Sequence, residues 1–183
     1  GSPYEASAAT GINNMSPGQS DNTAVNAGAV YVYTRSLGIW VQEAYVKAAN
    51  NPAGDWFGWS VALNGNGNTL AVGAWADNAT YVYTRTAGVW TEQAFIKDPT
   101  PKSFGMSVAL SNSGDTLAIS AKDDGSAAVG VNNGSPVSDC GTAAPTNCTA
   151  YSGAVYVYIR SAGAWTQQAY VKASNTAKNN SAQ

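Results

Sequence analysis

The chain offers few residues that could carry out acid–base or nucleophilic chemistry. It contains no histidine, so it lacks the general base of Ser–His–Asp and Cys–His sites and the commonest nitrogen ligand of zinc. Eleven acidic residues are present, but they do not gather in the sequence into the carboxylate pair that glycoside hydrolysis requires. We therefore expect a protein that is not an enzyme.

The two cysteines, Cys140 and Cys148, enclose seven residues of a loop that is rich in Gly, Pro and Thr. Two cysteines without histidine or a second cysteine pair do not match the ligand spacing of a zinc site. We predict a disulfide that closes this loop, with two free thiols as the alternative. A disulfide would indicate an oxidising compartment.

The composition excludes two classes of partner. The net charge is −2, and the nine Lys and Arg residues are scattered singly, so we expect no nucleic-acid binding. No apolar run approaches the ~20 residues that a membrane helix needs, so we expect no membrane insertion. Charged residues make up only 11% of the chain, and Asn, Ser, Thr and Gly replace them, as in turn-rich β-proteins that are secreted.

The elements that must position these residues are repeated along the chain. One module occurs three times, with Tyr-Val-Tyr followed by Arg, Trp and Lys in register, at residues 28–48, 79–98 and 153–173. A second module, FGWSVALNGNGNTLAVGA, occurs at residues 57–74 and again, with substitutions, at 104–121. Both modules alternate β-branched or aromatic residues with period two, and turn residues separate the runs. They predict repeats of four short antiparallel strands, which is typical of a β-propeller blade.

This pattern divides the chain into repeats. We predict an all-β, incomplete propeller of about two and a half blades, because closed propellers have four to eight blades. Its parts are the tail of a preceding repeat with a long loop (1–27), an outer half-blade (28–51), a full blade (52–98), a full blade with a loop inserted at 122–152 (99–174), and a C-terminal tail (175–183).

The second module resembles the FG-GAP repeat, which builds the propellers of integrin α-chains and of many bacterial surface and secreted proteins. Phe57-Gly58 and Phe104-Gly105 match the FG element, and Val72-Gly73-Ala74 matches the GAP element, with Trp75 where proline is usual. The resemblance implies an extracellular or cell-surface protein with a role in recognition or adhesion.

The family often binds Ca²⁺ in a loop of the type D-x-D-G-x-x-D. The corresponding positions here include Asn64, Asn66, Asn68 and Asp115. Carboxylates supply most of the affinity of a calcium site, so a single carboxylate in two loops predicts turns without metal and leaves only weak Ca²⁺ binding open. We expect no cofactor.

Three tryptophans depart from the repeat. Trp56, Trp59 and Trp75 align with Ser103, Met106 and Lys122, so the blade itself does not require them. They either fill space between unequal blades or contact a ligand. We select Trp56 and Trp75, with the adjacent Asp55 and Asp77, as the candidate binding residues, because exposed aromatic rings can stack on sugars or anchor a protein partner. The long loops at 4–27 and 122–152 are further places where binding could occur.

Other residues recur in register, and we interpret them as structural. Trp40, Trp90 and Trp165 are expected to pack between blades. The arginines and lysines of the module that occurs three times are interpreted as solvated strand ends or edge protection: Arg35, Arg85, Arg160, Lys47, Lys97 and Lys172. Asp123 and Asp124 are expected to form a turn rather than a cation site.

Two functions follow from these observations. The first is a non-enzymatic recognition or adhesion module that binds an extracellular glycan or protein through its loops. The alternative is a structural subunit that assembles rings or filaments by β-edge pairing between chains, since open blade edges recruit further strands. A homo-oligomer or a larger assembly is expected in either case.

Overall fold

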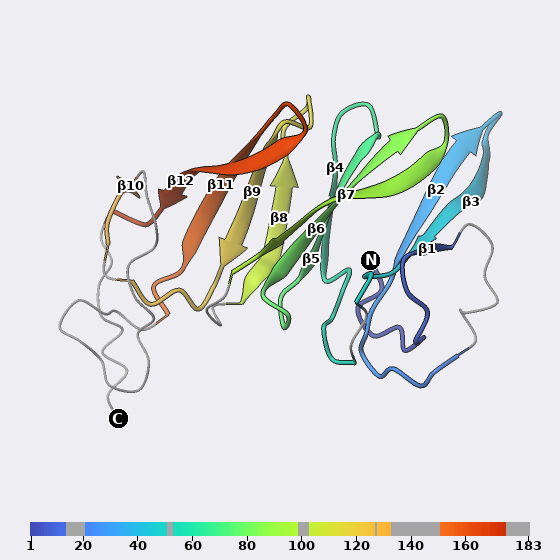
Figure 1. The fold of residues 1–183 in the computed structure, drawn as a ribbon, viewed down its shortest axis with the longest axis horizontal. Helices are drawn as coiled ribbons and strands as arrows, with labels where there is room; N and C mark the ends of the chain where they lie inside the picture. The colour runs from blue at the N-terminus through green and yellow to red at the C-terminus, as the bar shows by residue number, and fades with distance from the viewer. Residues whose placement is uncertain (14–20, 51–52, 99–102, 127, 133–150, 175–183) are drawn as a thin grey trace.

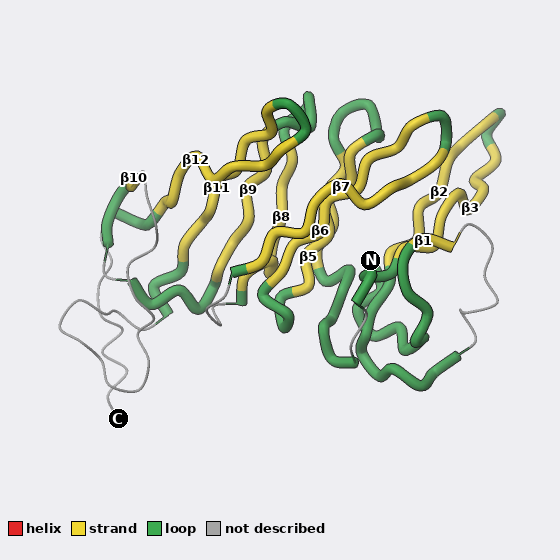
Figure 2. The backbone as a smooth tube through the Cα atoms, viewed as in Figure 1, coloured by secondary structure: helices red, strands yellow, loops and turns green. Residues whose placement is uncertain are grey.

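The computed structural model of the chain describes residues 1–13, 21–50, 53–98, 103–126, 128–132 and 151–174. These residues form twelve β-strands joined by turns and loops, and none of them lies in a helix (Figures 1 and 2). The described part of the chain accordingly has no helix that could cross a membrane. The predicted all-β class is confirmed.

The strands form three antiparallel sheets, which follow one another along the longest axis of the molecule (Figure 1). Sheet 1 has the order β1 (Ile12–Asn13), β3 (Ile39–Val46), β2 (Val30–Ser36). Sheet 2 has the order β4 (Ser60–Leu63), β5 (Thr69–Ala74), β6 (Ala79–Thr86), β7 (Val89–Lys97). Sheet 3 has the order β10 (Val131–Asn132), β12 (Ala164–Val171), β11 (Ala154–Ser161), β9 (Thr116–Ala121), β8 (Phe104–Leu110). The arrangement is that of an incomplete propeller.

The strands β1 and β10 lie within segments that the sequence predicts as loops. Ile12 pairs with Val46 at the outer edge of sheet 1, and Val131 pairs with Val171 at the same place in sheet 3. A two-residue strand carries too little periodicity to be recognised in a sequence. Its formation depends on the edge of β3 or β12 that it meets.

The last two long strands of each sheet form a hairpin, which we call the outer hairpin: β2–β3, β6–β7 and β11–β12. Each outer hairpin has a two-residue turn and contains a β-bulge. The two turn residues have positive φ in all three copies, as in Leu37 (48°) and Gly38 (85°), and this conformation matches the twist of the flanking strands. The register then shifts after Val32, Val82 and Val157. The shift leaves one unpaired residue in the last strand of each sheet, namely Glu43, Gln93 or Gln168. A bulge redirects the side chain of the extra residue.

The FG element brings the start of one sheet close to the backbone of another segment. Gly105 has a φ of 89°, and a Cβ atom there would lie 2.4 Å from the carbonyl oxygen of Ala79 in sheet 2. The preceding Phe104 packs edge-on against Tyr156, with 5.3 Å between the ring centroids. Phe57 makes the same contact with Tyr81 at 5.1 Å. The glycine therefore permits the approach, and the phenylalanine fills the space beside it.

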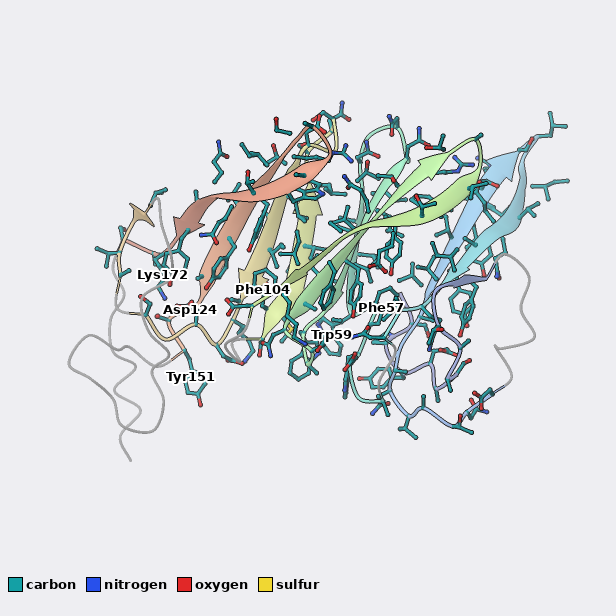
Figure 3. All side chains as sticks on the ribbon, in the orientation of Figure 1. Phe57, Trp59, Phe104, Asp124, Tyr151 and Lys172 are labelled. Atoms are coloured by element: carbon teal, nitrogen blue, oxygen red, sulfur yellow. The ribbon has the colours of Figure 1, made fainter. Side chains whose placement is uncertain are left out.

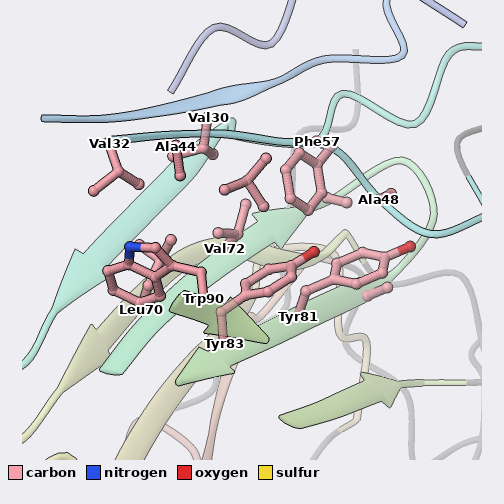
Figure 4. Packing of buried hydrophobic residues seen from close by; sticks show 13 residues of the cluster. Val30, Val32, Ala44, Ala48, Phe57, Leu70, Val72, Tyr81, Tyr83 and Trp90 are labelled. Carbon is pink, nitrogen blue, oxygen red and sulfur yellow. The ribbon is translucent and has the colours of Figure 1, made fainter. Parts of the chain in front are cut away.

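Two hydrophobic cores lie between the three sheets. Between sheets 1 and 2, Val30 and Val32 face Tyr81, Tyr83 and other buried side chains of sheet 2 (Figure 4). Between sheets 2 and 3, the core joins Ala71 and Val82 to the aromatic face of sheet 3. Each sheet thus packs its valine and alanine face against the tyrosine face of the sheet that follows.

The repeated Arg and Trp join neighbouring sheets through the bulge residue. Arg85 forms an ion pair with Glu43 of sheet 1, and the Nε1 of Trp90 donates to Glu43 Oε2 at 3.2 Å. In the same way, the Nε1 of Trp165 donates to Gln93 Oε1 at 3.0 Å, and Arg160 reaches that oxygen at 3.4 Å. The interpretation of these arginines as solvated strand ends is therefore wrong for Arg85 and Arg160, because each binds the preceding sheet.

The same two positions of sheet 1 face no preceding sheet within the described residues. Trp40 is 65% exposed, whereas Trp90 is 4% exposed. Arg35 is exposed and lies over the Trp40 ring at 6.0 Å. The prediction that the repeated tryptophans pack between blades holds for Trp90 and Trp165, but not for Trp40 within this chain.

Candidate functional site

An acid–lysine pair recurs in all three sheets. Glu5 Oε2 lies 2.6 Å from Lys47 Nζ in sheet 1, and Asp124 Oδ1 lies 3.0 Å from Lys172 Nζ in sheet 3. In sheet 2, Asp77 forms an ion pair with Lys97. The interpretation of the lysines as solvated is wrong for Lys47 and Lys172, whose side chains are fully buried in these pairs.

The pair of sheet 3 is closed by a polar network. Asp124 accepts hydrogen bonds from Tyr170 Oη (2.7 Å), Tyr156 Oη (3.0 Å) and the backbone N–H of Ser126 (3.0 Å). Burial by itself would raise the pKa of Asp124, but the hydrogen bonds from Tyr170 and Ser126 and the bond and charge of Lys172 outweigh burial and lower this pKa. Asp124 therefore does more than form the predicted turn, because it ties the first residues of the long loop to the last two long strands of the sheet.

The pair of sheet 2 remains open because its connection is short. Only Trp75–Asn78 lie between β5 and β6, so this connection provides no loop or extra strand that could cover the hairpin of β6 and β7. Lys97 keeps 45% of its side chain exposed. Phe95 stands where sheet 3 has Tyr170, so the hydroxyl donor is missing, and Phe95 is 45% exposed. The Oδ2 of Asp77 is buried without a hydrogen-bond partner among the described residues.

The three tryptophans that depart from the repeat meet in this open region. The centroid distances are 5.5 Å for Trp56–Trp59, 5.7 Å for Trp56–Trp75 and 5.9 Å for Trp59–Trp75. Tyr4 extends the group by an edge contact with Trp56 at 5.0 Å. We call these four residues the aromatic cluster. Trp59 is 39% and Tyr4 is 63% exposed, and Figure 3 shows Trp59 along the same edge of the molecule as Asp124 and Tyr151.

Polar groups with unused hydrogen-bonding capacity lie beside the aromatic cluster. The Nε1 of Trp75 and the Oδ2 of Asp55 are buried and have no partner among the described residues. Burial raises the pKa of Asp55 to about 6, and the charge of Asp77 contributes in the same direction, while Lys97 opposes the shift. The region therefore offers aromatic faces and one ammonium group at its surface. Beneath them lie an indole donor and two carboxylate oxygens that have no partner among the described residues.

The loops that correspond to the family's calcium site form turns. Asn64 Oδ1 accepts from the backbone N–H groups of Asn68 (3.0 Å) and Thr69 (2.9 Å), and Asn66 Oδ1 accepts from Asn68 N at 2.9 Å. Asp115 is paired with Arg160 at 2.8 Å. Among the described residues, no group of three or more His, Cys, Asp or Glu could hold a metal ion.

The structure places the predicted site residues as follows. Trp56 and Trp75 are in contact, and Asp55 and Asp77 lie close enough for their charges to interact. Trp59 ranks below the other two tryptophans in the sequence prediction. Tyr4 enters it only as the first residue of the loop 4–27, and Lys97 is not predicted as a binding residue. The equivalence of Asp77 and Asp124 was available from the offset of 47 residues between Phe57 and Phe104. Cys140 and Cys148, with their predicted disulfide, lie outside the described residues.

A protein-family model matches a stretch of the chain that includes most of this region. Residues 40–85 match a family model described as FG-GAP repeat. The matched stretch runs from β3 to β6 and contains all three tryptophans of the aromatic cluster. The resemblance inferred from the sequence is confirmed for residues 40–85. No curated protein matches the chain.

FG-GAP repeats occur in extracellular and surface proteins, and the family is generally non-enzymatic. In this chain the FG-GAP repeat differs from the segment that follows it in two respects. It has the shortest connection between the strands that correspond to β5 and β6, and it has tryptophans where residues 103–122 have Ser103, Met106 and Lys122.

Proposed function

We propose that the chain is a non-enzymatic, extracellular recognition module that binds a glycan at the aromatic cluster. One observation carries the proposal. Three tryptophans that the repeat does not require meet at an exposed edge. Beside them lie two carboxylates, each with a buried oxygen that has no partner among the described residues.

The chemistry favours a sugar over an apolar side chain of a protein. A buried polar group without a partner costs about 1–3 kcal/mol, so a ligand that supplies the missing partners gains affinity. The Oδ2 atoms of Asp55 and Asp77 and the Nε1 of Trp75 are buried. When the side chains rotate toward the surface, a sugar hydroxyl can donate to Asp55 or Asp77 and can accept from Trp75 Nε1. The C–H face of the sugar ring can stack on an indole, which gives a large contact area at little cost in conformational entropy.

The proposed binding requires no cofactor, because no step depends on a metal ion. Chelation with EDTA should therefore leave glycan binding unchanged. A loss of binding on chelation would instead favour weak Ca²⁺ binding in the turns at Asn64–Asn68 and Asp115.

A glycan array followed by titration of tryptophan fluorescence tests this function. The expected result is binding to at least one class of oligosaccharide, which Trp59→Ala weakens by roughly tenfold or more. Trp40→Ala is the matched control, because Trp40 is also exposed but lies in sheet 1 on the Arg35 side. The absence of any array signal, or an equal effect of the two variants, would refute glycan binding at this site.

The alternative function is self-assembly into rings or filaments, with β-edge pairing between chains. The observation that favours assembly is that one face of sheet 1 is uncovered within the described residues. On this face Arg35 and Trp40 have the positions that Arg85 and Trp90 use to bind Glu43, so a sheet of another chain could stack there. Gln168, the bulge residue of sheet 3, is exposed at the other end of the molecule, so one chain could stack on the next in a head-to-tail manner.

Light scattering at increasing protein concentration tests this alternative. Gln168→Glu supplies the carboxylate that Glu43 provides in sheet 1, so it should strengthen association, and Trp40→Ala should weaken it. A monomer at all concentrations for the parent chain and for Gln168→Glu would exclude assembly through this face.

A further inference from the structure

The inner edge of β2 is unpaired along most of its length. In sheet 2 the corresponding strand β6 lies between β5 and β7, and in sheet 3 β11 lies between β9 and β12. Within the described residues, β2 pairs only with β3, apart from a bridge between Ser2 and Ala29. Ser2 N donates to Ala29 O at 2.7 Å, and Ala29 N donates to Ser2 O at 2.9 Å. Pairing on this edge therefore begins at Ala29 and stops there.

A groove of about 320 Å³ lies beside this unpaired edge. Its lining is mostly apolar and comes from β2 on one side and from β4 and β5 on the other, with Gly1 at its end: Val30, Val32, Val61, Leu63 and Leu70. Unpaired strand edges next to apolar surface are sites of strand addition.

In sheet 3, the surface of β8 that corresponds to the groove side of β4 is covered, because the preceding sheet 2 has its first hairpin, β4–β5. Val61 is 42% exposed, whereas its counterpart Val108 is 8% exposed and packs against Ala71 and Ala62 of sheet 2. Leu63 is 54% exposed, and its counterpart Leu110 packs against the same core. The inner hairpin of sheet 2 therefore supplies to sheet 3 the cover that Val61 and Leu63 lack.

We infer that the groove is an acceptor site for a β-hairpin of the type formed by β8 and β9. The occupant is an apolar hairpin in which one strand has the pattern Thr-Leu-Ala-Ile, with alanine on the face toward sheet 2. This surface is separate from the aromatic cluster, and the inference does not depend on glycan binding.

The two complete sheets fix the register of the incoming strand. In sheet 3, Ile119 pairs with Tyr156, Ala118 with Val157 and Leu117 with Tyr158. The same pairing on β2 places the isoleucine opposite Tyr31, the alanine opposite Val32 and the leucine opposite Tyr33. Gly1 and Ser2 already occupy the two positions that follow, which correspond to Ser120 and Ala121. The strand that fits the groove therefore ends where Gly1 begins.

A peptide with the sequence of residues 104–119, FGMSVALSNSGDTLAI, is the probe. It stops at Ile119 because Gly1 and Ser2 fill the last two positions. With a fluorescent label, it should bind the full chain saturably at micromolar concentrations, as measured by anisotropy. A scrambled peptide of the same composition, and the peptide carrying Ala118→Asp, should bind at least ~10-fold more weakly, the latter because its carboxylate would face Val61 and Leu63.

Variants of the chain locate the site. Val61→Asp should weaken peptide binding by ~10-fold or more, because it puts a charge in the groove. Val89→Asp, at a 54% exposed position beside a hairpin turn, is the matched control and should change binding less than ~2-fold. Circular dichroism and the melting temperature check that both variants fold.

As a second readout, the same sixteen residues are fused directly before Gly1. The fusion should raise the melting temperature relative to a scrambled extension, because binding to the folded state stabilises it.

Equal binding of the scrambled peptide, or equal effects of Val61→Asp and Val89→Asp, would overturn the inference. Self-association of the chain that Val61→Asp abolishes would also overturn it, since the occupant would then be a second copy. Glycan binding by Val61→Asp should be unchanged, so failure of this inference is distinguishable from failure of the recognition function.

Discussion

The acid–lysine pairs of sheets 2 and 3 occupy equivalent positions but lie in opposite environments. Asp124 and Lys172 have no exposed side-chain surface, and two tyrosine hydroxyls complete the hydrogen bonds of the carboxylate. Lys97 is 45% exposed, and one oxygen of Asp77 has no partner in the part of the chain that the structure describes. The difference follows from the connection before the third strand of each sheet, which is long in sheet 3 and four residues long in sheet 2.

This comparison indicates how one repeat can serve structure and recognition. Where the connection is long, the pair is buried at the start of the loop and is not available to a ligand. Where the connection is short, Lys97 is accessible, and tryptophans gather beside the pair. The predictions below test this division, beginning with the largest expected effect.

Lys172→Met should lower the free energy of unfolding by about 3–5 kcal/mol, because it leaves the buried carboxylate of Asp124 without its counter-ion. Lys97→Met is the matched control in sheet 2. It should cost less than about 1 kcal/mol, since its ion pair is partly exposed. Urea unfolding measures both values, and equal losses would show that the two pairs do not differ in the way described.

Tyr170→Phe should lower the free energy of unfolding by about 2 kcal/mol, because it removes the 2.7 Å hydrogen bond to the buried Asp124. With this substitution, position 170 of sheet 3 carries the same residue as its counterpart in sheet 2, Phe95. The lost hydrogen bond should also raise the pKa of Asp124 toward its ordinary range, which carboxyl NMR shifts can follow. An unchanged carboxyl titration would show that Tyr170 does not hold this carboxylate.

Asp55 should give stability a pH dependence that Asp55→Asn removes. Because the pKa of Asp55 is raised to about 6 in the folded state, the folded protein binds this proton more tightly than the unfolded chain does. Stability relative to Asp55→Asn should therefore fall as the pH rises from about 4 to 7, by up to about 2 kcal/mol. Urea unfolding of both proteins at several pH values measures it, and parallel curves would contradict the burial of this carboxyl group.

Trp59→Ala should have the smallest effect on stability, less than about 1 kcal/mol, because Trp59 is 39% exposed. Trp90→Ala, in contrast, should cost about 3 kcal/mol or more, since Trp90 is buried between sheets 1 and 2. Thermal unfolding compares the two. A large loss for Trp59→Ala would indicate that the aromatic cluster packs the sheet and is not poised for a ligand.

Most of the fold could be predicted from the sequence because each repeated strand shows an alternation of residue types with period two. The alternation in Val30–Arg35 gave the two faces of β2, and the glycine of each outer module gave the hairpin turn. The bulge could not be predicted, because the shift at Val32 depends on the twist and pairing of two strands. Consequently the link from Arg85 and Trp90 to Glu43 was missed, and the arginine was interpreted as solvated.

The candidate site could be predicted only in part. The tryptophans stood out because the repeat does not account for them, but their contact depends on three separate segments meeting at one edge of the structure. The contribution of Tyr4 was not predictable, because it comes from a loop without periodicity. The exposure of Lys97 follows from the short connection between β5 and β6, compared with the long connection at the same place in sheet 3. It could not be predicted from the lysine and its neighbours in the sequence.

The indole N–H signals of the six tryptophans provide the most direct test of the central claim. The labelled chain is titrated with the oligosaccharide that gives the strongest array signal, and the shifts are followed by NMR. We predict that the signals of Trp56, Trp59 and Trp75 move, while those of Trp40, Trp90 and Trp165 stay in place. Shifts confined to the repeated tryptophans, or no shift at all, would contradict the assignment of recognition to the open region of sheet 2.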